Sequence, residues 1–193
     1  MRGNDIIDLK VAAKESNWQR KGFLEKIFTP QERIYITEAL CPEKMVWTLW
    51  SQKESAYKAY TRQFSGRFFD PKKINCTLLT ACAGTATINS TTYRTVSSIA
   101  DKYIYSIASH EGLTAPPLTD YLFYSNTNDY TTLSGIIYQL MIAKFAAATG
   151  KSVNNISVIK NTNGIPFLEY KKNQQAIPVS ISHHGQYGAF TIN

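Results

Sequence analysis

Cysteine, acidic residues and long apolar runs are scarce in this sequence, and each scarcity argues against a class of protein. The 193 residues include only three cysteines, Cys41, Cys76 and Cys82. This odd number, without metal-ligand spacing, speaks against a disulfide framework or a zinc site, so we expect reduced thiols. No apolar run reaches the roughly 20 residues that cross a membrane, and Asp5 stands where a signal peptide would be apolar. We therefore expect a cytoplasmic protein that does not bind a membrane.

Acidic residues are also fewer than basic ones. The chain has 14 Asp and Glu against 21 Lys and Arg, a net charge of +7 at neutral pH. Such a surplus favours phosphate-rich ligands, nucleic acid or acidic proteins as partners. Hydrophobic residues make up 44% of the chain, which is enough for a globular core and argues against disorder.

Helical periodicity and capping patterns predict the helices. The longest is expected over 43–63, which has no internal Gly or Pro and has one apolar side. The sequence TPQE at 29–32 has the form of a capping box and predicts that a helix begins at Pro30. Further helices are expected over 17–27 and 132–149.

Strand-like sequence follows both long helices. A short strand is expected at 5–9, and Thr-, Val- and Ile-rich segments occupy 74–108 and 156–192. Because helix followed by antiparallel strands occurs twice, we predict an α+β pseudodimer of two similar halves, each a helix packed on a small antiparallel sheet. The predicted domains are a first half at 1–108, a connecting segment at 109–130 and a second half at 131–193.

The helix expected over 43–63 carries a cluster of charged side chains. Glu54 and Lys58 are four residues apart and project from one face, with Trp50 one turn earlier. The simplest interpretation is a surface ion pair that slightly stabilises the helix. A carboxylate close to two ammonium groups, Lys53 and Lys58, also suits a divalent cation and a polyphosphate, because each charge neutralises another.

Asp5 stands in an otherwise apolar strand, where a carboxylate is costly unless it is paired or coordinated. It could cap a turn at the strand end or bind a metal. Gly3, two residues earlier, would let a ligand or another strand approach the backbone. Mg²⁺ prefers one or two protein carboxylates together with phosphate and water oxygens. Asp5 and Glu54 would supply that number if the strand packs on the helix.

Hydroxyl and imidazole groups gather near the C-terminal end, in the sequence VSISHHG at 179–185. Strand alternation places Ser180 and Ser182 on one face and leaves His183 and His184 at the strand end. Two hydroxyls and an imidazole can bind a phosphate, although a histidine pair in a turn can equally have no function. A zinc site lacks further ligands, and a hydrolytic serine lacks the nucleophile-elbow pattern.

Together these three motifs resemble those of the 4′-phosphopantetheinyl transferase superfamily, which includes holo-acyl-carrier-protein synthases and surfactin-type enzymes. The family patterns Gly-x-Asp, Trp-x-x-Lys-Glu-Ala/Ser-x-x-x-Lys and Ser-x-Ser-His stand here at 3–5, 50–58 and 180–183. The segment 28–32 matches a weaker family block. The middle motif is the most specific of these.

The resemblance implies a transferase that moves 4′-phosphopantetheine from coenzyme A to a serine of an apo carrier protein in the presence of Mg²⁺. It makes Asp5 and Glu54 the metal ligands, and Glu54 and Lys58 the catalytic residues. The serine, deprotonated by Glu54 or by a metal-bound water, would attack the β-phosphate, and 3′,5′-adenosine diphosphate would leave. The implied contacts of coenzyme A are Lys53, Lys58, Ser182 and His183.

Two positions depart from the family pattern. Ile7 stands where some two-half members carry a third acidic ligand, which favours two carboxylates plus waters. Ile165 replaces the lysine of the usual Gly-Lys-Pro, so a basic contact to coenzyme A is missing there. The motif order is that of the compact, trimeric synthases, whereas the length is that of two halves and 133–192 resembles the first half of a surfactin-type enzyme. We expect a rearranged pseudodimer, with a catalytic first half and a nucleotide-side second half, that acts as a monomer.

Two rival functions come from other classes. A basic nucleic-acid-binding module fits the charge and the 12 tyrosines, but the basic residues are scattered and no stacking motif appears, so we expect no nucleic acid partner. A family member that has lost activity would only bind its carrier. The expected partner is an acidic acyl or peptidyl carrier protein of fatty-acid or secondary-metabolite biosynthesis. The candidate contacts for that carrier are Arg62, Arg67, Lys72 and Lys73.

Overall fold

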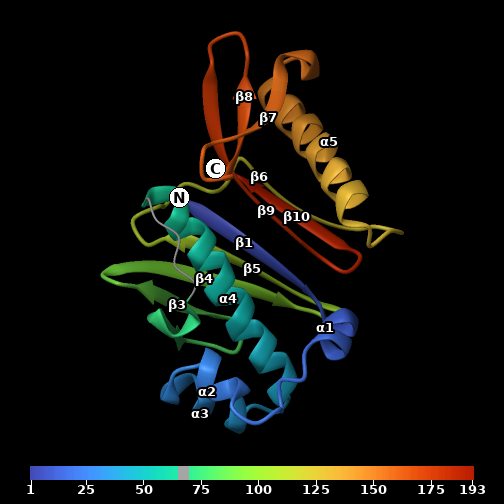
Figure 1. The fold of residues 1–193 in the computed structure, drawn as a ribbon. Coiled ribbons are helices and arrows are strands. Elements are labelled where there is room, and N and C mark those ends of the chain that lie inside the picture. Colours follow the sequence, from blue (N-terminus) through green and yellow to red (C-terminus); the bar gives the residue numbers. More distant parts are fainter. Residues whose placement is uncertain (65–69) are drawn as a thin grey trace.

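Two five-stranded antiparallel sheets, each covered by one long helix, form the architecture (Figure 1). The computed structural model describes residues 1–64 and 70–193. The first half contains β1 (Arg2–Asp8), α1 (Leu9–Glu15), α2 (Phe23–Ile27), α3 (Pro30–Glu38), α4 (Pro42–Gln63), η1 (Pro71–Lys73), β2 (Ile74–Leu78), β3 (Ala83–Ile88), β4 (Thr91–Ile99) and β5 (Tyr103–His110). The second half contains β6 (Thr119–Tyr124), α5 (Tyr130–Thr149), η2 (Val153–Asn155), β7 (Ile156–Lys160), β8 (Pro166–Tyr170), β9 (Gln175–His184) and β10 (Tyr187–Ile192).

The two sheets have the same connectivity. The strand order is β1-β5-β4-β3-β2 in the first sheet and β6-β10-β9-β8-β7 in the second, so each half is a strand, a long helix and a four-stranded meander. In each sheet the last strand of the meander pairs with the strand that precedes the helix. The predicted α+β fold of two similar halves is confirmed.

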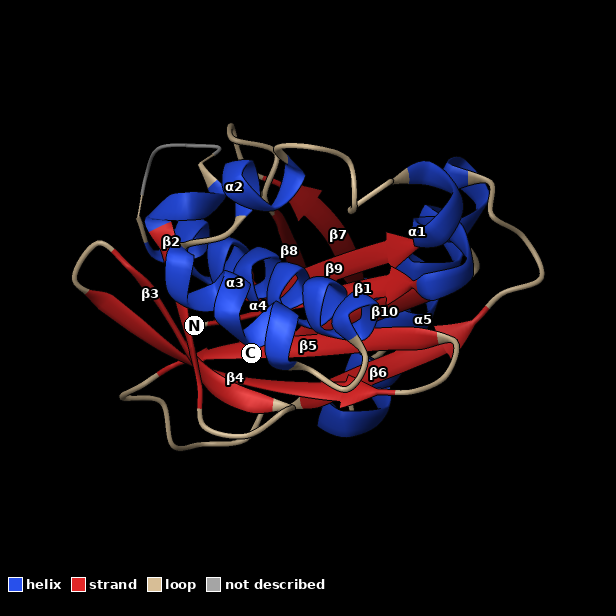
Figure 2. Ribbon diagram, turned by 90° about the horizontal axis from the view of Figure 1, so that it is seen from below, coloured by secondary structure: helices blue, strands red, loops and turns tan. Residues whose placement is uncertain are grey.

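Helix α4 lies across the first sheet, and its buried face fixes the position of the charged side chains (Figure 2). Val46, Leu49 and Ala56 are fully buried between the helix and the sheet. Gly3 of β1 makes a close approach possible, because a Cβ atom there would overlap the Ser55 carbonyl oxygen. The glycine therefore admits a helix to the backbone, where the sequence had suggested a ligand or another strand.

Helix α5 covers the second sheet with one row of apolar side chains. Leu133, Ile137, Met141 and Phe145 recur at helical spacing and are buried. The helix has the length and composition of a membrane span, but these two criteria are also met by core helices of soluble proteins, and this row packs against the second sheet. The helix ends at Gly150, which adopts the left-handed conformation typical of a C-terminal cap.

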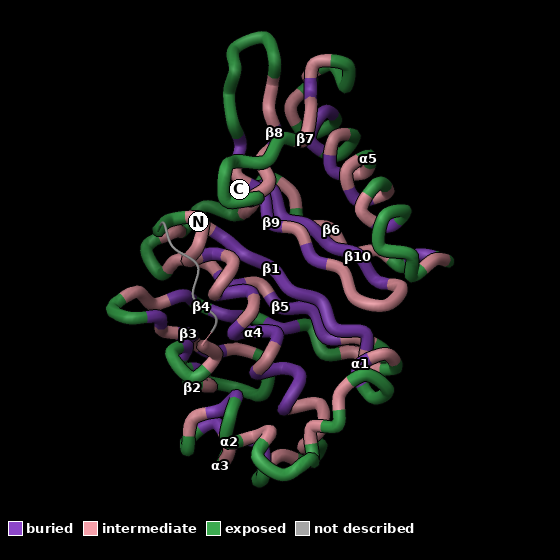
Figure 3. The backbone as a smooth tube through the Cα atoms, in the orientation of Figure 1, coloured by how far each residue is buried: buried purple, intermediate pink, exposed green. Residues whose placement is uncertain are grey.

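The halves meet where β1 lies against β9 and β10, and these strands are buried along much of their length (Figure 3). Ile6, Tyr105, Tyr187 and Ala189 form a small shared core at this junction. The two ends of the described chain are joined as well, because the Arg2 backbone N–H donates to the side chain of Asn193 at 2.8 Å. Residues of both halves can therefore face one site.

Two local predictions differ from the structure. The helix expected over 17–27 is confined to α2, and α1 forms earlier, where Asp8 accepts hydrogen bonds from the Lys10 and Val11 N–H groups and caps it. The expected connecting segment at 109–130 contains strand β6, which pairs with β10. The capping box at 29–32 is confirmed, with both of its reciprocal hydrogen bonds formed.

Candidate active site

Asp5 and Lys58 form an ion pair between β1 and α4. The Lys58 ammonium lies 2.9 Å from Asp5 Oδ1 and also donates to the Asn4 carbonyl at 3.1 Å. The second carboxylate oxygen, Asp5 Oδ2, is buried and has no hydrogen-bond partner among the residues that the structure describes. A buried carboxylate oxygen without a partner is costly, so this atom is suited to bind a cation.

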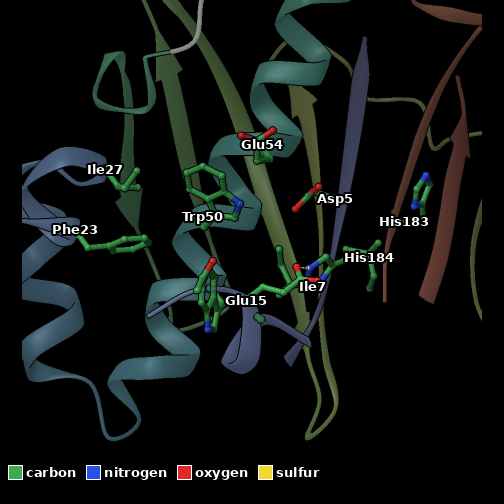
Figure 4. A pocket seen from close by; sticks show the side chains of 13 residues that line it. Asp5, Ile7, Glu15, Phe23, Ile27, Trp50, Glu54, His183 and His184 are labelled. Carbon is green, nitrogen blue, oxygen red and sulfur yellow. Dashed lines mark ion pairs between the residues drawn. The ribbon is translucent and has the colours of Figure 1, made fainter. Parts of the chain in front are cut away.

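Glu54 faces the same cavity from α4, one helical turn before Lys58 (Figure 4). Burial and the nearby charge of Asp5 raise the pKa of Glu54 to about 7, although the positive charge of Lys58 opposes the shift. Two carboxylates in this cavity therefore repel each other when both are ionised. A cation bound between them would remove that repulsion.

The cavity encloses about 440 Å³ and has both a polar and an apolar wall. Asp5 and His183 lie on one side of it and Phe23 and Ile27 on the other, with Glu54 and Trp50 of α4 between them (Figure 4). Ile7 also lines it.

Magnesium is a suitable ion for this site. Among residues 1–64 and 70–193, no group of three His, Cys, Asp or Glu side chains is arranged to hold a metal. Asp5 and Glu54 line one cavity, and two carboxylates are within the number that Mg²⁺ prefers from a protein, together with phosphate and water oxygens. The unpartnered Asp5 Oδ2 supports this fit.

Strand β9 brings two serines to the junction, and they differ in their partners. Ser180 Oγ accepts a hydrogen bond from the Asn4 N–H at 3.0 Å and so ties β9 to β1. Ser182 Oγ is buried and has no partner among the described residues. His183 follows it, and burial together with the positive charge of Lys58 lowers the pKa of its imidazole. Ser182 and His183 therefore remain candidate ligand contacts, whereas Ser180 joins the halves.

His184 has a structural contact that sequence reasoning did not identify. Its Nδ1 accepts a hydrogen bond from the Asp8 N–H at 2.9 Å, and Asp8 Oδ2 accepts from the Gln186 N–H at 3.3 Å. Gly185 has a positive φ of 56°, and a side chain there would overlap Asp8. Asp8, His184 and Gly185 thus fix the end of β9 against β1.

Lys53 does not reach the cavity, which corrects the expectation that it binds coenzyme A. Its ammonium lies 2.8 Å from a carboxylate oxygen of Glu32, and both side chains are buried. It also donates to the carbonyls of Pro71 and Ile74. An ammonium with three interior acceptors has no free N–H for a ligand, so Lys53 holds α3, η1 and β2 against α4.

The residues that were expected to contact the carrier protein lie in different environments. Arg62 donates to the Val179 carbonyl at 2.7 Å and lies at the junction of the halves, where burial lowers its pKa to about 10. This corrects its assignment to a carrier surface. Lys72 and Lys73 are exposed on η1. Arg67 lies outside the described residues.

Similarity to known proteins is found with a family model and with solved structures. A family model for the 4′-phosphopantetheinyl transferase superfamily matches residues 2–111, more than half of the chain, and this segment includes Asp5, Glu54 and Lys58. No curated protein matches the chain. Among solved structures, holo-[acyl-carrier-protein] synthase (AcpS) of Thermotoga maritima is similar over 91% of this chain and 83% of that chain, with 10% sequence identity and a TM-score of 0.44.

Proposed function

This chain belongs to the 4′-phosphopantetheinyl transferase superfamily, and on that premise we propose that it transfers 4′-phosphopantetheine from coenzyme A to a serine of an apo carrier protein, with Mg²⁺ held by Asp5 and Glu54. The observation that carries the proposal is the buried, unpartnered Asp5 Oδ2 in one cavity with Glu54. The Mg²⁺ ion, when bound, would neutralise charge on the pyrophosphate of coenzyme A.

The side chains at this cavity have separate roles in the proposed reaction. The serine oxygen forms a bond to the β-phosphorus, the bond from that phosphorus to the bridging oxygen breaks, and 3′,5′-adenosine diphosphate leaves. Glu54 faces the cavity and takes the serine proton. Lys58 points toward Asp5 and stabilises the negative charge on the pyrophosphate oxygens. Ser182 and His183 contact the nucleotide part from β9.

We propose that one chain is the working unit. Asp5 and Glu54 come from the first half and His183 from the second, and all three line one cavity. The domains at 1–108 and 131–193 would then be a catalytic half and a nucleotide-side half. Light scattering should give the mass of a monomer, and a stable trimer would contradict this proposal. Because coenzyme A and apo carrier proteins are the proposed substrates, we infer that the protein acts in the cytoplasm.

The decisive experiment is incorporation of labelled coenzyme A into a panel of fatty-acid, polyketide and peptide-synthetase carriers. Asp5→Ala and Glu54→Ala should each lower the rate about 100-fold or more, since a metal ion supplies several kcal/mol of charge stabilisation. Asp101→Ala, which removes an exposed carboxylate paired with Lys44, is the control and should leave the rate unchanged. Rates within a few-fold of wild type in both site variants would refute the metal assignment. Carrier binding without transfer on every carrier would indicate a protein that has lost its activity.

A further inference from the structure

A groove of about 350 Å³ lies on the second-half side of Lys58. It adjoins the cavity of Asp5 and Glu54, because His183 lines both. Helix α4, helix α5, strand β9 and the turn between β7 and β8 form its walls. The lining side chains used below are Lys58, Tyr130, Lys160, Ser182 and His183.

The groove contains a polar atom that lacks a partner. Ser182 is 5% exposed, and its hydroxyl makes no hydrogen bond within the described part of the chain. His183 stands beside it, and its imidazole has a lowered pKa. A buried hydroxyl and a neutral imidazole are donors that a sugar or phosphate oxygen can satisfy.

Tyr130 adds an aromatic surface to the same groove. Its ring meets the His183 ring edge to face with centroids 4.6 Å apart, and 70% of Tyr130 is exposed. A large aromatic side chain with most of its surface free is suited to a nucleobase, because base–aromatic stacking contributes about 1–3 kcal/mol.

Lys160 brings a second ammonium group, at the end of β7. It lies opposite Pro166 in the antiparallel pairing of β7 and β8, next to the turn where Ile165 supplies no charge. Lys160 is exposed and has no ion pair among residues 1–64 and 70–193, whereas Lys58 is already paired with Asp5. The two lysines therefore place positive charge at two separate positions of the groove. Lys58 lies beside Asp5, and Lys160 lies at the end of β7.

Coenzyme A, the substrate of the proposed function, carries phosphate at two separate positions. The pyrophosphate must reach Asp5 and Glu54 for the reaction to occur, so it cannot also lie at Lys160. The remaining phosphate is on the ribose 3′ oxygen, at the nucleotide end. We propose that Lys160 is the specificity-determining residue that binds this 3′-phosphate, with the base against Tyr130. This inference rests on the proposed function for the identity of the ligand and for the place of its pyrophosphate.

Binding measurements with coenzyme A and 3′-dephospho-coenzyme A test this directly, since the two ligands differ only in that phosphate. Titration calorimetry of the whole chain with Mg²⁺ needs no carrier protein and no transfer. The wild type should bind coenzyme A more tightly by about tenfold, as expected for a charge-assisted contact. Lys160→Ala should reduce the ratio of the two affinities to near one, because it weakens the binding of coenzyme A alone. Lys160→Arg should keep most of the preference, and Lys171→Ala, an exposed lysine outside the groove, should keep all of it.

An unchanged ratio in Lys160→Ala, or no preference in the wild type, would overturn the assignment. A preserved ratio without transfer to any carrier would refute the proposed function alone, and no binding of either ligand would refute both. Tyr130 provides an independent check. Tyr130→Ala should weaken the binding of both ligands by the same factor, about tenfold. The affinities of Tyr130→Phe should stay within about twofold of wild type.

Discussion

The Lys58 ammonium lies 2.9 Å from one oxygen of Asp5, while the other oxygen of the same carboxylate is buried without a partner in the described structure. One oxygen of Asp5 is thus neutralised within the protein, and the other is available to a cation. Because Glu54 faces the same cavity, a cation there would contact two carboxylates and lie close to one ammonium group. With two carboxylates and one ammonium group, the site is short of positive charge until a cation binds.

Replacing Glu54 by Gln should stabilise the metal-free protein at alkaline pH. Burial and Asp5 raise the Glu54 pKa to about 7 from 4.5, so between these values the folded protein holds a proton that the unfolded chain has released. The stability from this proton is fully present below pH 4.5 and is lost as the pH rises through about 7. Scanning calorimetry should therefore show a small difference in melting temperature between variant and wild type at pH 5 and the largest at pH 8. Added Mg²⁺ should reduce this difference in melting temperature at pH 8. A difference that did not depend on pH would contradict the raised pKa of Glu54.

Removing one partner of the interior Lys53–Glu32 pair should strongly destabilise the fold. Lys53→Met leaves a buried carboxylate without its cation, which costs about 3–5 kcal/mol of unfolding free energy. The matched control is Lys44→Met, whose exposed pair with Asp101 should contribute less than about 1 kcal/mol. Urea unfolding measures the free energy of unfolding of both variants. If Lys53→Met kept its stability but lost affinity for coenzyme A, Lys53 would be a ligand contact after all.

Substitution by alanine should change the stability of the fold in opposite directions at two glycine positions. In Gly3→Ala the new methyl group overlaps the backbone of α4 at Ser55 and Ala59, so the helix must move away from Asp5. Overpacking of this kind costs about 1–3 kcal/mol or more. At Gly135, exposed within α5, a methyl group would meet nothing within 4 Å, and Gly135→Ala should gain about 0.5–1 kcal/mol from helix propensity. Equal melting temperatures for the two variants would contradict the packing argument.

Charge reversal on η1 should weaken binding of the carrier protein. The Pro71 carbonyl accepts a hydrogen bond from Lys53, so η1 and its exposed Lys72 and Lys73 are held against the helix that carries Glu54. The double variant Lys72→Glu/Lys73→Glu should raise the KM for an acidic carrier several-fold and leave the KM for coenzyme A unchanged.

The adjacent pair Lys171 and Lys172 on the second half provides a matched control, because its reversal changes the net charge equally. Salt should raise the carrier KM of the wild type, since exposed charges are screened beyond about 8 Å at physiological ionic strength. Equal effects from the two reversals would show that only net charge matters.

The sequence indicated that Asp5 and Glu54 could meet if the strand packs on the helix, and the resemblance implied that Lys58 acts beside them. Glu54 and Lys58 are one turn apart on a long amphipathic helix, and the structure packs β1, the strand of Asp5, on that helix. Lys53 was misplaced because consecutive helical residues point about 100° apart, so a neighbour of Glu54 in sequence faces elsewhere. Its partner Glu32 lies on α3, and no local sequence pattern predicts that ion pair.

Long-range contacts explain what else the sequence could not provide. Strand β6 is short and lies among prolines and polar residues, and it forms because β10 offers an edge to pair with. The contact of His184 with Asp8 joins residues 176 positions apart. Neither residue has a local signal for it, since the contact depends on how the two sheets are placed.

The repeated strand order also limits how many reactions one molecule can support. Both halves have the same scaffold, yet Glu54, the proposed base, lies on α4, while α5 contains no Asp or Glu. Conversely, the Ser-Ile-Ser-His run stands only on β9. Under the proposed function neither half would be a complete enzyme by itself, so titration should end at one equivalent of coenzyme A per chain.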